Sequence, residues 1–156
     1  MSVSIRKAVL ADLPALLKLS VQARAFHNCL LNNYFANIDP QTESAFLEKA
    51  IQEENKIFLV ARKEDETVGM LSAGFKNLPY LSRPRVCLVD TVCVDENHRR
   101  EAIGKLLISE LKNLCMREDI DEIDLSVYVG NAKAFSFYEA LGFSAKKHEL
   151  RLDIKK

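Results

Sequence analysis

The sequence predicts a single α/β (α+β) domain over residues 1–156, built on a mixed β-sheet. Apolar runs of strand length alternate with stretches of helical spacing, and no linker or internal repeat separates them. The length falls within the ~100–200 residues of a typical domain. Hydrophobic residues make up 48% and charged residues 28%, which is ordinary for a globular protein and excludes intrinsic disorder.

Six strands are expected from apolar runs or from alternating apolar and polar residues. The run at 86–94 is apolar on both alternating faces, which is typical of a central strand. Residues 123–129 alternate, which predicts a half-buried strand. The expected strands span residues 3–8, 57–62, 68–75, 86–94, 123–129 and 150–154.

Four helices are expected between these strands. In the first, Asp12 is the predicted N-cap and Pro14 lies just inside the helix. The second opens at Asp39 and Pro40 after an irregular stretch. The third runs from about residue 102 to 116, and the fourth covers 131–141. Gly142 is the predicted C-cap of the fourth helix.

Composition argues against several classes of protein. The 22 basic and 22 acidic residues cancel, so the basic excess of a nucleic-acid-binding protein is missing. No apolar run approaches the ~18 residues of a membrane span, and no signal peptide is recognisable. The four cysteines form no CxxC pair and the three histidines are scattered. We therefore expect no metal site, and reduced thiols in a cytoplasmic protein.

The turn that follows the strand at 86–94 is the strongest local signal. It is basic, contains small residues and leads directly into a helix, whose first backbone N–H groups are unpaired. Because Ala102 and Gly104 have little or no side chain, a phosphate or pyrophosphate can approach that backbone. Alternatively, Gly104 only lets the helix pack closely on the sheet. Lys105 is followed by Leu106 and the stretch holds one glycine, so it is neither a P-loop nor a Rossmann turn.

A second signal is the aromatic helix at residues 131–143. Core packing is the expected role of Phe135, Phe137 and Phe143. Tyr138 differs, because its hydroxyl is costly to bury without a partner.

Together, these segments resemble the GCN5-related N-acetyltransferases, the GNAT superfamily. The acyl-CoA motif of that family is matched by Arg99-Arg100-Glu101-Ala102-Ile103-Gly104, preceded by Val92-Cys93-Val94-Asp95. Its downstream motif is matched at Asn131, Ala134, Phe137, Tyr138, Gly142 and Phe143. Its N-terminal motif is matched at Ile5, Arg6, Ala8, Asp12, Leu13 and Leu16.

The resemblance implies a GNAT fold with six to seven strands, about four helices, and two splayed parallel strands that form an acetyl-CoA cleft. Backbone groups of Val92 and Val94 would bind the pantetheine arm, and N–H groups across 100–105 the pyrophosphate. Asn131 would contact CoA or cap its helix. The implied cofactor-binding residues are Val92, Cys93, Val94, Arg99, Arg100, Glu101, Ala102, Ile103, Gly104, Lys105 and Asn131.

The implied reaction is direct attack of a primary amine on the acetyl thioester. Tyr138 would protonate the departing thiolate, and N–H groups around Val92 or Cys93 would stabilise the developing oxyanion. Asp90 is the candidate base or amine anchor, on a face shared with apolar neighbours; alternatively it pairs with a nearby group and only shapes the site. These apolar neighbours are Val86, Leu88, Val92 and Val94.

Other interpretations remain open. The chain could be a non-catalytic acyl-CoA sensor or interaction module, and a nucleic-acid-binding module is disfavoured by the neutral charge. A nucleophilic pair of Cys93 and His98 is less favoured than a structural cysteine. The sequence does not identify the acceptor amine, and both a monomer and a homodimer are compatible with it.

Overall fold

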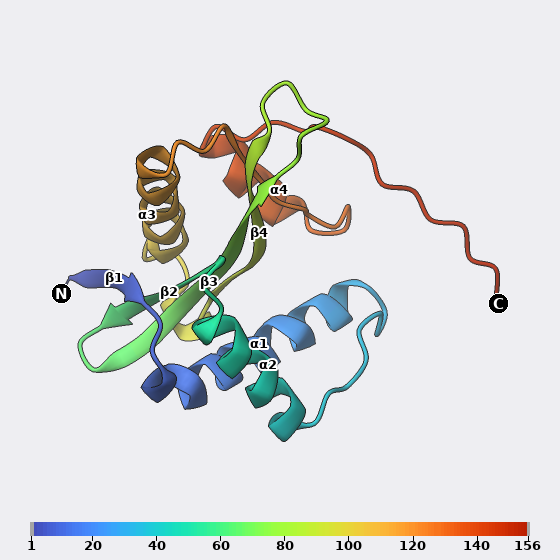
Figure 1. The fold of residues 1–156 in the computed structure, drawn as a ribbon. Coiled ribbons are helices and arrows are strands. Elements are labelled where there is room, and N and C mark those ends of the chain that lie inside the picture. The colour runs from blue at the N-terminus through green and yellow to red at the C-terminus, as the bar shows by residue number, and fades with distance from the viewer. Residues whose placement is uncertain (1, 156) are drawn as a thin grey trace. The chain divides into compact units, whose positions relative to one another are not determined.

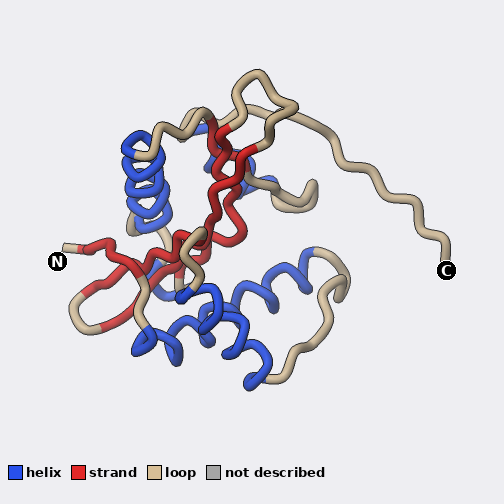
Figure 2. The backbone as a smooth tube through the Cα atoms, in the orientation of Figure 1, coloured by secondary structure: helices blue, strands red, loops and turns tan. Residues whose placement is uncertain are grey.

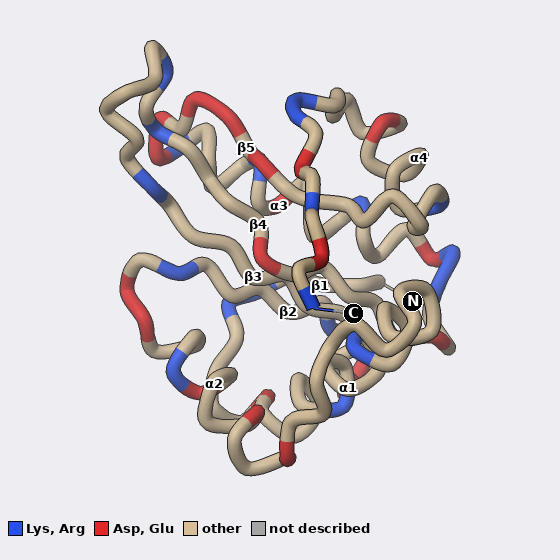
Figure 3. Tube along the Cα trace, turned by 90° about the vertical axis from the view of Figure 1, so that its right-hand side faces the viewer, with Lys and Arg blue, Asp and Glu red and all other residues tan. Residues whose placement is uncertain are grey.

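The computed structural model describes residues 2–155. The chain divides into two compact units, Met1–Ser126 and Val127–Lys156. The first unit contains the sheet and three α-helices, and the second contains one α-helix. Basic and acidic residues are interspersed along the chain (Figure 3). None of the helices within residues 2–155 combines the length and the apolarity needed to cross a membrane.

The mixed α/β architecture is confirmed in the first unit, where five strands form one sheet in the order β1-β2-β3-β4-β5. Figure 2 shows the strands in red and the helices in blue. Neighbours among the first four strands are antiparallel, and β5 pairs with β4 in parallel. The strands are β1 (Val3–Lys7), β2 (Lys56–Lys63), β3 (Glu66–Asn77), β4 (Arg85–Val94) and β5 (Glu122–Asp124).

The expected count of six to seven strands is wrong for the part of the chain described. The strand expected at 123–129 shortens to β5, and residues 150–154 form no strand. Leu150, Leu152 and Ile154 alternate with polar residues yet are 91%, 82% and 83% exposed. Alternation fixes which face a side chain takes, but a strand also needs a hydrogen-bonded neighbour.

Helices cover both faces of the sheet in the first unit. Helices α1 (Leu13–Leu30) and α2 (Pro40–Gln52) lie on one face, and α3 (Ile103–Arg117) lies on the other (Figure 1). Two short 3₁₀ helices, η1 (Leu10–Asp12) and η2 (Glu96–His98), precede α1 and α3. The predicted cap of α2 is confirmed, because Asp39 accepts a hydrogen bond from the Thr42 N–H at 2.9 Å.

Asp12 is the N-cap residue of α1, as the sequence predicts, but its side chain makes no capping hydrogen bond to the helix. Its carboxylate instead binds the Arg6 guanidinium through two hydrogen bonds of 2.8 and 2.9 Å, and accepts the Val9 N–H. The carboxylate binds Arg6 rather than the helix N-terminus because a bidentate, charged pair with arginine is stronger than a hydrogen bond from one neutral N–H group. This pair joins the end of β1 to the start of α1.

The two faces of the sheet are packed differently. On the α1–α2 face, a buried cluster includes Leu16, Leu19, Val60 and Met70. On the other face, α3 approaches so closely that a Cβ at Gly69 would lie 3.0 Å from Ile103. Gly69 therefore allows the helix to rest on the sheet, which fixes the position of the α3 N-terminus.

A buried carboxylate joins α1 to α2. Glu43 accepts hydrogen bonds from Ser20 and from the Arg24 guanidinium, and its side chain is almost fully buried. The hydrogen bonds from Arg24 lower the pKa of Glu43, and burial opposes this only in part. The network fixes the first two helices relative to each other.

Replacing Glu43 with glutamine should lower the free energy of unfolding at neutral pH by about 1.5–3 kcal/mol, because Arg24 loses its charged partner. The pKa of Glu43 is lowered by folding, so its contribution is present above the unfolded pKa of about 4.3 and is lost as the pH falls through the folded pKa. Urea unfolding of both proteins from about pH 7 to pH 3 should therefore show converging stabilities. Glu48→Gln, at an exposed α2 position, is the control, and an equal loss there would contradict the network's role.

Candidate functional site

Strand β4 contains a β-bulge at Asp90. Ser72 of β3 lies opposite Thr91, but the next residue of β3, Ala73, lies opposite Val89. Asp90 is thus an extra residue without a partner on β3. One extra residue reverses the alternation of side chains along the remainder of a strand.

The bulge corrects the prediction that Asp90 shares one face with four apolar neighbours. Val92 lies opposite Leu71, on the face that α3 covers, whereas Leu88 lies opposite Gly74, on the face of α1 and α2. Two of those neighbours therefore lie on each side of the sheet. The sequence did not reveal this, because β4 is apolar on both faces and either register fits.

Asp90 is paired with a lysine from the far side of β3. Its carboxylate, 46% exposed, accepts a hydrogen bond of 2.7 Å from Lys56 Nζ, and the lysine side chain is 31% exposed. Lys56, on β2, lies opposite Gly74 of β3, and a Cβ added at Gly74 would lie 3.7 Å from Lys56 Cδ. The lysine therefore extends past a position without a side chain to reach the bulge.

One edge of β4 is open beyond the bulge. The parallel ladder joins β4 to β5 only over Val86–Leu88, and no strand within residues 2–155 continues that pairing. On the opposite edge, Asp95 N–H donates to Val68 O at 2.9 Å. Because bonded residues alternate in an antiparallel pair, Val92 and Val94 direct their N–H and C=O groups to the open edge. An extended ligand can bind there like an additional strand.

Cys93 faces away from this edge. By the same alternation its backbone points to β3, and its buried Sγ lies 3.4 Å from Leu19 O on α1. Burial raises the pKa of Cys93 to about 11, so the nucleophilic thiolate is scarce at neutral pH. These observations favour a structural cysteine, and neither its backbone nor its thiol has a place on the open edge.

The turn between β4 and α3 exposes backbone donors. Asp95 starts it by accepting the Asn97 N–H at 2.9 Å. Arg100 and Ala102 then adopt left-handed conformations, with φ of 69° and 60°. Such conformations turn successive N–H groups to one side, and the first N–H groups of α3, from Ile103 to Lys105, have no acceptor within the helix.

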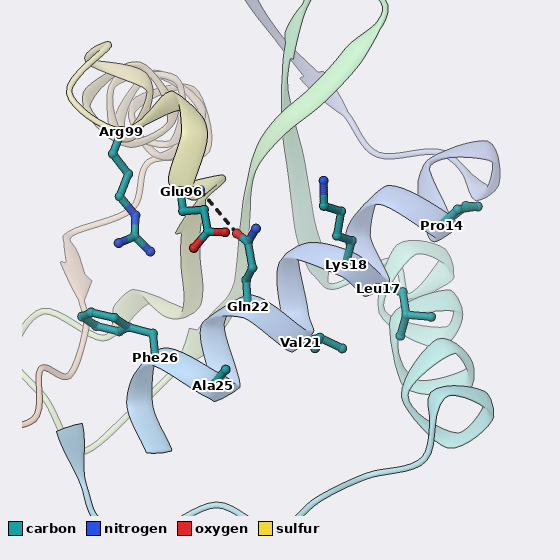
Figure 4. A pocket seen from close by; sticks show the side chains of 9 residues that line it. All are labelled: Pro14, Leu17, Lys18, Val21, Gln22, Ala25, Phe26, Glu96 and Arg99. Atoms are coloured by element: carbon teal, nitrogen blue, oxygen red, sulfur yellow. Dashed lines mark hydrogen bonds between the residues drawn. The ribbon is translucent and has the colours of Figure 1, made fainter. Parts of the chain in front are cut away.

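Side chains anchor this turn on two sides. Glu101 accepts a hydrogen bond of 2.6 Å from Lys63 of β2, which balances its charge beside the donors. The Arg99 guanidinium lies 5.4 Å from the centre of the Phe26 ring on α1. Arg99 and Phe26 line a surface hollow between α1 and the turn. There, the Glu96 N–H also donates a hydrogen bond to Gln22 at 3.4 Å (Figure 4).

The residues of the turn fit a diphosphate. The α3 N-terminus supplies unpaired N–H groups and the positive end of the helix dipole. In addition, the buried Nδ1 of His98 has no hydrogen-bond partner. For a metal ion, by contrast, no group of three or more suitable side chains is found among residues 2–155.

The second unit holds the two remaining predicted residues. Asn131 caps α4 (Ala132–Ala140) by accepting the Ala134 N–H at 3.2 Å. The Tyr138 ring makes edge contacts with Phe137 and Phe143, at centroid distances of 5.1 and 5.5 Å. Partial burial raises the pKa of Tyr138 above its ordinary value of about 10, so the hydroxyl is protonated at neutral pH as an exposed tyrosine would also be. Gly142 follows the helix with a left-handed φ of 97°, as the C-cap prediction requires.

The expected core packing of the other aromatic residues is wrong in part. Phe135 and Phe137 are 42% and 36% exposed, and α4 has no buried residue. Spacing on a short helix indicated an apolar stripe but could not show what covers it.

Comparison with known proteins identifies the family. The model of the acetyltransferase (GNAT) family matches residues 23–143. The chain belongs to the GNAT family. This GNAT chain is similar to human N-acetyltransferase 8, with 29% identity over 60% of the chain and 40% of that protein. It is also similar to the L-amino acid N-acetyltransferase AaaT of Escherichia coli, with 31% identity over 60% of the chain and 59% of that protein.

Two N-acetyltransferase family 8 relatives from mouse are 29% identical, and the matched part spans 38% and 37% of their length. Solved structures share the fold of this GNAT chain. A tetramutant of the BH1408 protein from Bacillus halodurans has a TM-score of 0.88 at 25% identity, covering 97% of this chain and 99% of that one. Glucosamine-6-phosphate N-acetyltransferase from Arabidopsis thaliana has a TM-score of 0.73 at 18% identity, covering 99% and 100%.

Sequence reasoning missed Lys56 and Lys63. Each pairs with a carboxylate more than thirty residues away, Asp90 and Glu101 respectively. Charged residues at strand ends are common, so neither lysine gave a signal of its own. Only the register of β2 against β3 and β4 brings these pairs together.

Replacing Ala102 with glycine should leave the free energy of unfolding unchanged or raise it. An alanine at φ 60° is strained by about 1 kcal/mol, and this gain offsets the entropy cost of glycine. Ala45→Gly, at an exposed position inside α2, is the matched control and should cost about 1 kcal/mol. Thermal or urea unfolding measures both, and an equal loss in the two variants would contradict the left-handed geometry at Ala102.

Proposed function

We propose that this GNAT chain is an acetyl-CoA-dependent N-acetyltransferase that moves an acetyl group to a primary amine by direct attack. The main support is the open edge of β4 at Val92 and Val94, which leads directly into the unpaired N–H groups of the α3 N-terminus. An extended arm and a diphosphate are joined in the same order in coenzyme A. The activity of the matching relatives, whose names identify them as N-acetyltransferases, supports the same class.

Binding of the donor is assigned to backbone groups. Val92 and Val94 would pair with the pantetheine arm, and the N–H groups between Arg100 and Lys105 would bind the pyrophosphate. In this proposal Glu101 acts indirectly, because its ion pair with Lys63 fixes the turn while neutralising its charge. Asn131 caps α4 through its side-chain oxygen, and in this proposal the rest of its amide would contact CoA.

The chemical steps are assigned to three groups. The thioester of the donor supplies an acyl group with a fair leaving group. Asp90 would bind the acceptor ammonium and accept or relay its proton, since only a neutral amine attacks. The N–H of Val92 points to the open edge and can stabilise charge developing on the carbonyl oxygen. Tyr138, whose hydroxyl is protonated at neutral pH, would donate a proton to the departing thiolate.

Names of relatives do not select the acceptor. They include an L-amino acid acetyltransferase, and among the fold neighbours an aminoglycoside acetyltransferase and a glucosamine-6-phosphate acetyltransferase. All of these acceptors contain an amine, so the proposal is limited to a primary amine of a small molecule or peptide.

Tyr138→Phe should lower kcat about 10²-fold and leave the Kd for CoA within about threefold, because it removes a proton donor but keeps the ring contacts. Thiol release from acetyl-CoA, with calorimetric titration of CoA, separates the two effects. Tyr80→Phe removes a hydroxyl from a tyrosine that is 79% exposed, and should change neither quantity.

The same measurements distinguish the sensor alternative. Saturable CoA binding without thiol release, over a panel of polyamines, amino acids, aminoglycosides and peptides, would favour a non-catalytic module. If CoA gives no heat of binding, the donor site itself is wrongly assigned.

A further inference from the structure

The bulge presents an ammonium and a carboxylate side by side. Lys56 Nζ lies 2.7 Å from Asp90 Oδ2, and both side chains are partly exposed. The two residues come from strands separated by β3, and the Lys56 side chain runs beside Gly74 of β3, where an added Cβ would lie 3.7 Å from Lys56 Cδ. A ligand reaching Asp90 therefore meets the lysine ammonium as well.

This pair is built to open. A partly exposed ion pair contributes little to stability, because water solvates both charges well when they separate. Two of the other ion pairs in the first unit differ, since the carboxylates of Asp12 and Glu43 are almost fully buried. Lys56 and Asp90 can therefore separate from each other and bind a ligand instead, at a small cost in free energy.

We propose that Lys56 and Asp90 together select a free α-amino acid as the acetyl acceptor, with Asp90 binding the α-ammonium and Lys56 the α-carboxylate. This rests on the proposed N-acetyltransferase function and names its substrate class. In such a zwitterion the ammonium nitrogen and the carboxylate carbon are both bonded to Cα, about 2.5 Å apart. Both charges of the ligand can thus engage the neighbouring charges of the protein.

Charge complementarity separates this class from other amines. One ion pair inside the protein is exchanged for two with the amino acid, and charged hydrogen bonds are the stronger kind. A polyamine would place further positive charge beside Lys56, which opposes binding. A peptide N-terminus or an amino-acid carboxamide offers the amine without the carboxylate, and leaves Lys56 without a partner.

The test compares each L-amino acid with its own carboxamide. Thiol release at saturating acetyl-CoA gives kcat/KM for both, and their ratio is compared between variants, so that differences in amine reactivity cancel. Lys56→Met should lower this ratio about 10- to 100-fold, because it removes a charged hydrogen bond to the carboxylate. Lys56→Arg should retain most of the ratio. Lys76→Met, an exposed lysine on β3 two residues from Gly74, is the control and should leave the ratio unchanged.

Asp90→Asn should lower kcat/KM for the amino acid and the carboxamide alike, since both present the amine. An unchanged ratio in Lys56→Met, or a preference of the wild type for spermidine over every amino acid, would overturn this inference while leaving the acetyltransferase proposal intact. If no amine of either kind releases thiol and CoA does not bind, both proposals fall.

Discussion

The extra residue at Asp90 fixes the geometry of β4 on which the candidate site depends. The bulge reverses the alternation of side chains along the strand. Beyond it, the side chains of Val92 and Val94 face α3, and their backbone groups point to the open edge. The bulged residue has no partner on β3, and its carboxylate lies partly in solvent. A regular strand would have put Asp90 and Val92 on one face of the sheet.

Such a strand is stable only if its surroundings are rigid. An unpaired edge and two left-handed residues each cost free energy, which the core on both faces must offset. Gly69 lets α3 rest directly on β3, and the Glu43 network joins the two helices of the opposite face. The turn at residues 99–102 is then attached at both sides, to Lys63 of β2 and to Phe26 of α1. Its N–H groups are thereby positioned before any ligand binds.

The sequence predicted the elements better than their relationships. Strands at 57–62, 68–75 and 86–94 and the helix from about 102 agree with β2, β3, β4 and α3 within a few residues, because apolar patterning is a local property. The bulge could not be predicted from the sequence, because β4 is apolar on both faces and an extra residue does not change the pattern of such a run. The partner of Asp90 was hidden as well, because it depends on strand register across β3. At residues 150–154 the pattern indicated a strand, but it did not supply the neighbour that a strand requires.

Solvent exposure gives chemically similar ion pairs different consequences in this unit. The Arg24–Glu43 pair is removed from water, so separating it would leave a buried charge, and it therefore behaves as part of the framework. The Lys56–Asp90 pair has a comparable separation but remains hydrated, so its partners can be replaced by those of a ligand. Its position at the bulge, beside the free edge of β4, makes such an exchange relevant to chemistry. The ligand class proposed for this site therefore follows from the solvent exposure of the Lys56 and Asp90 charges.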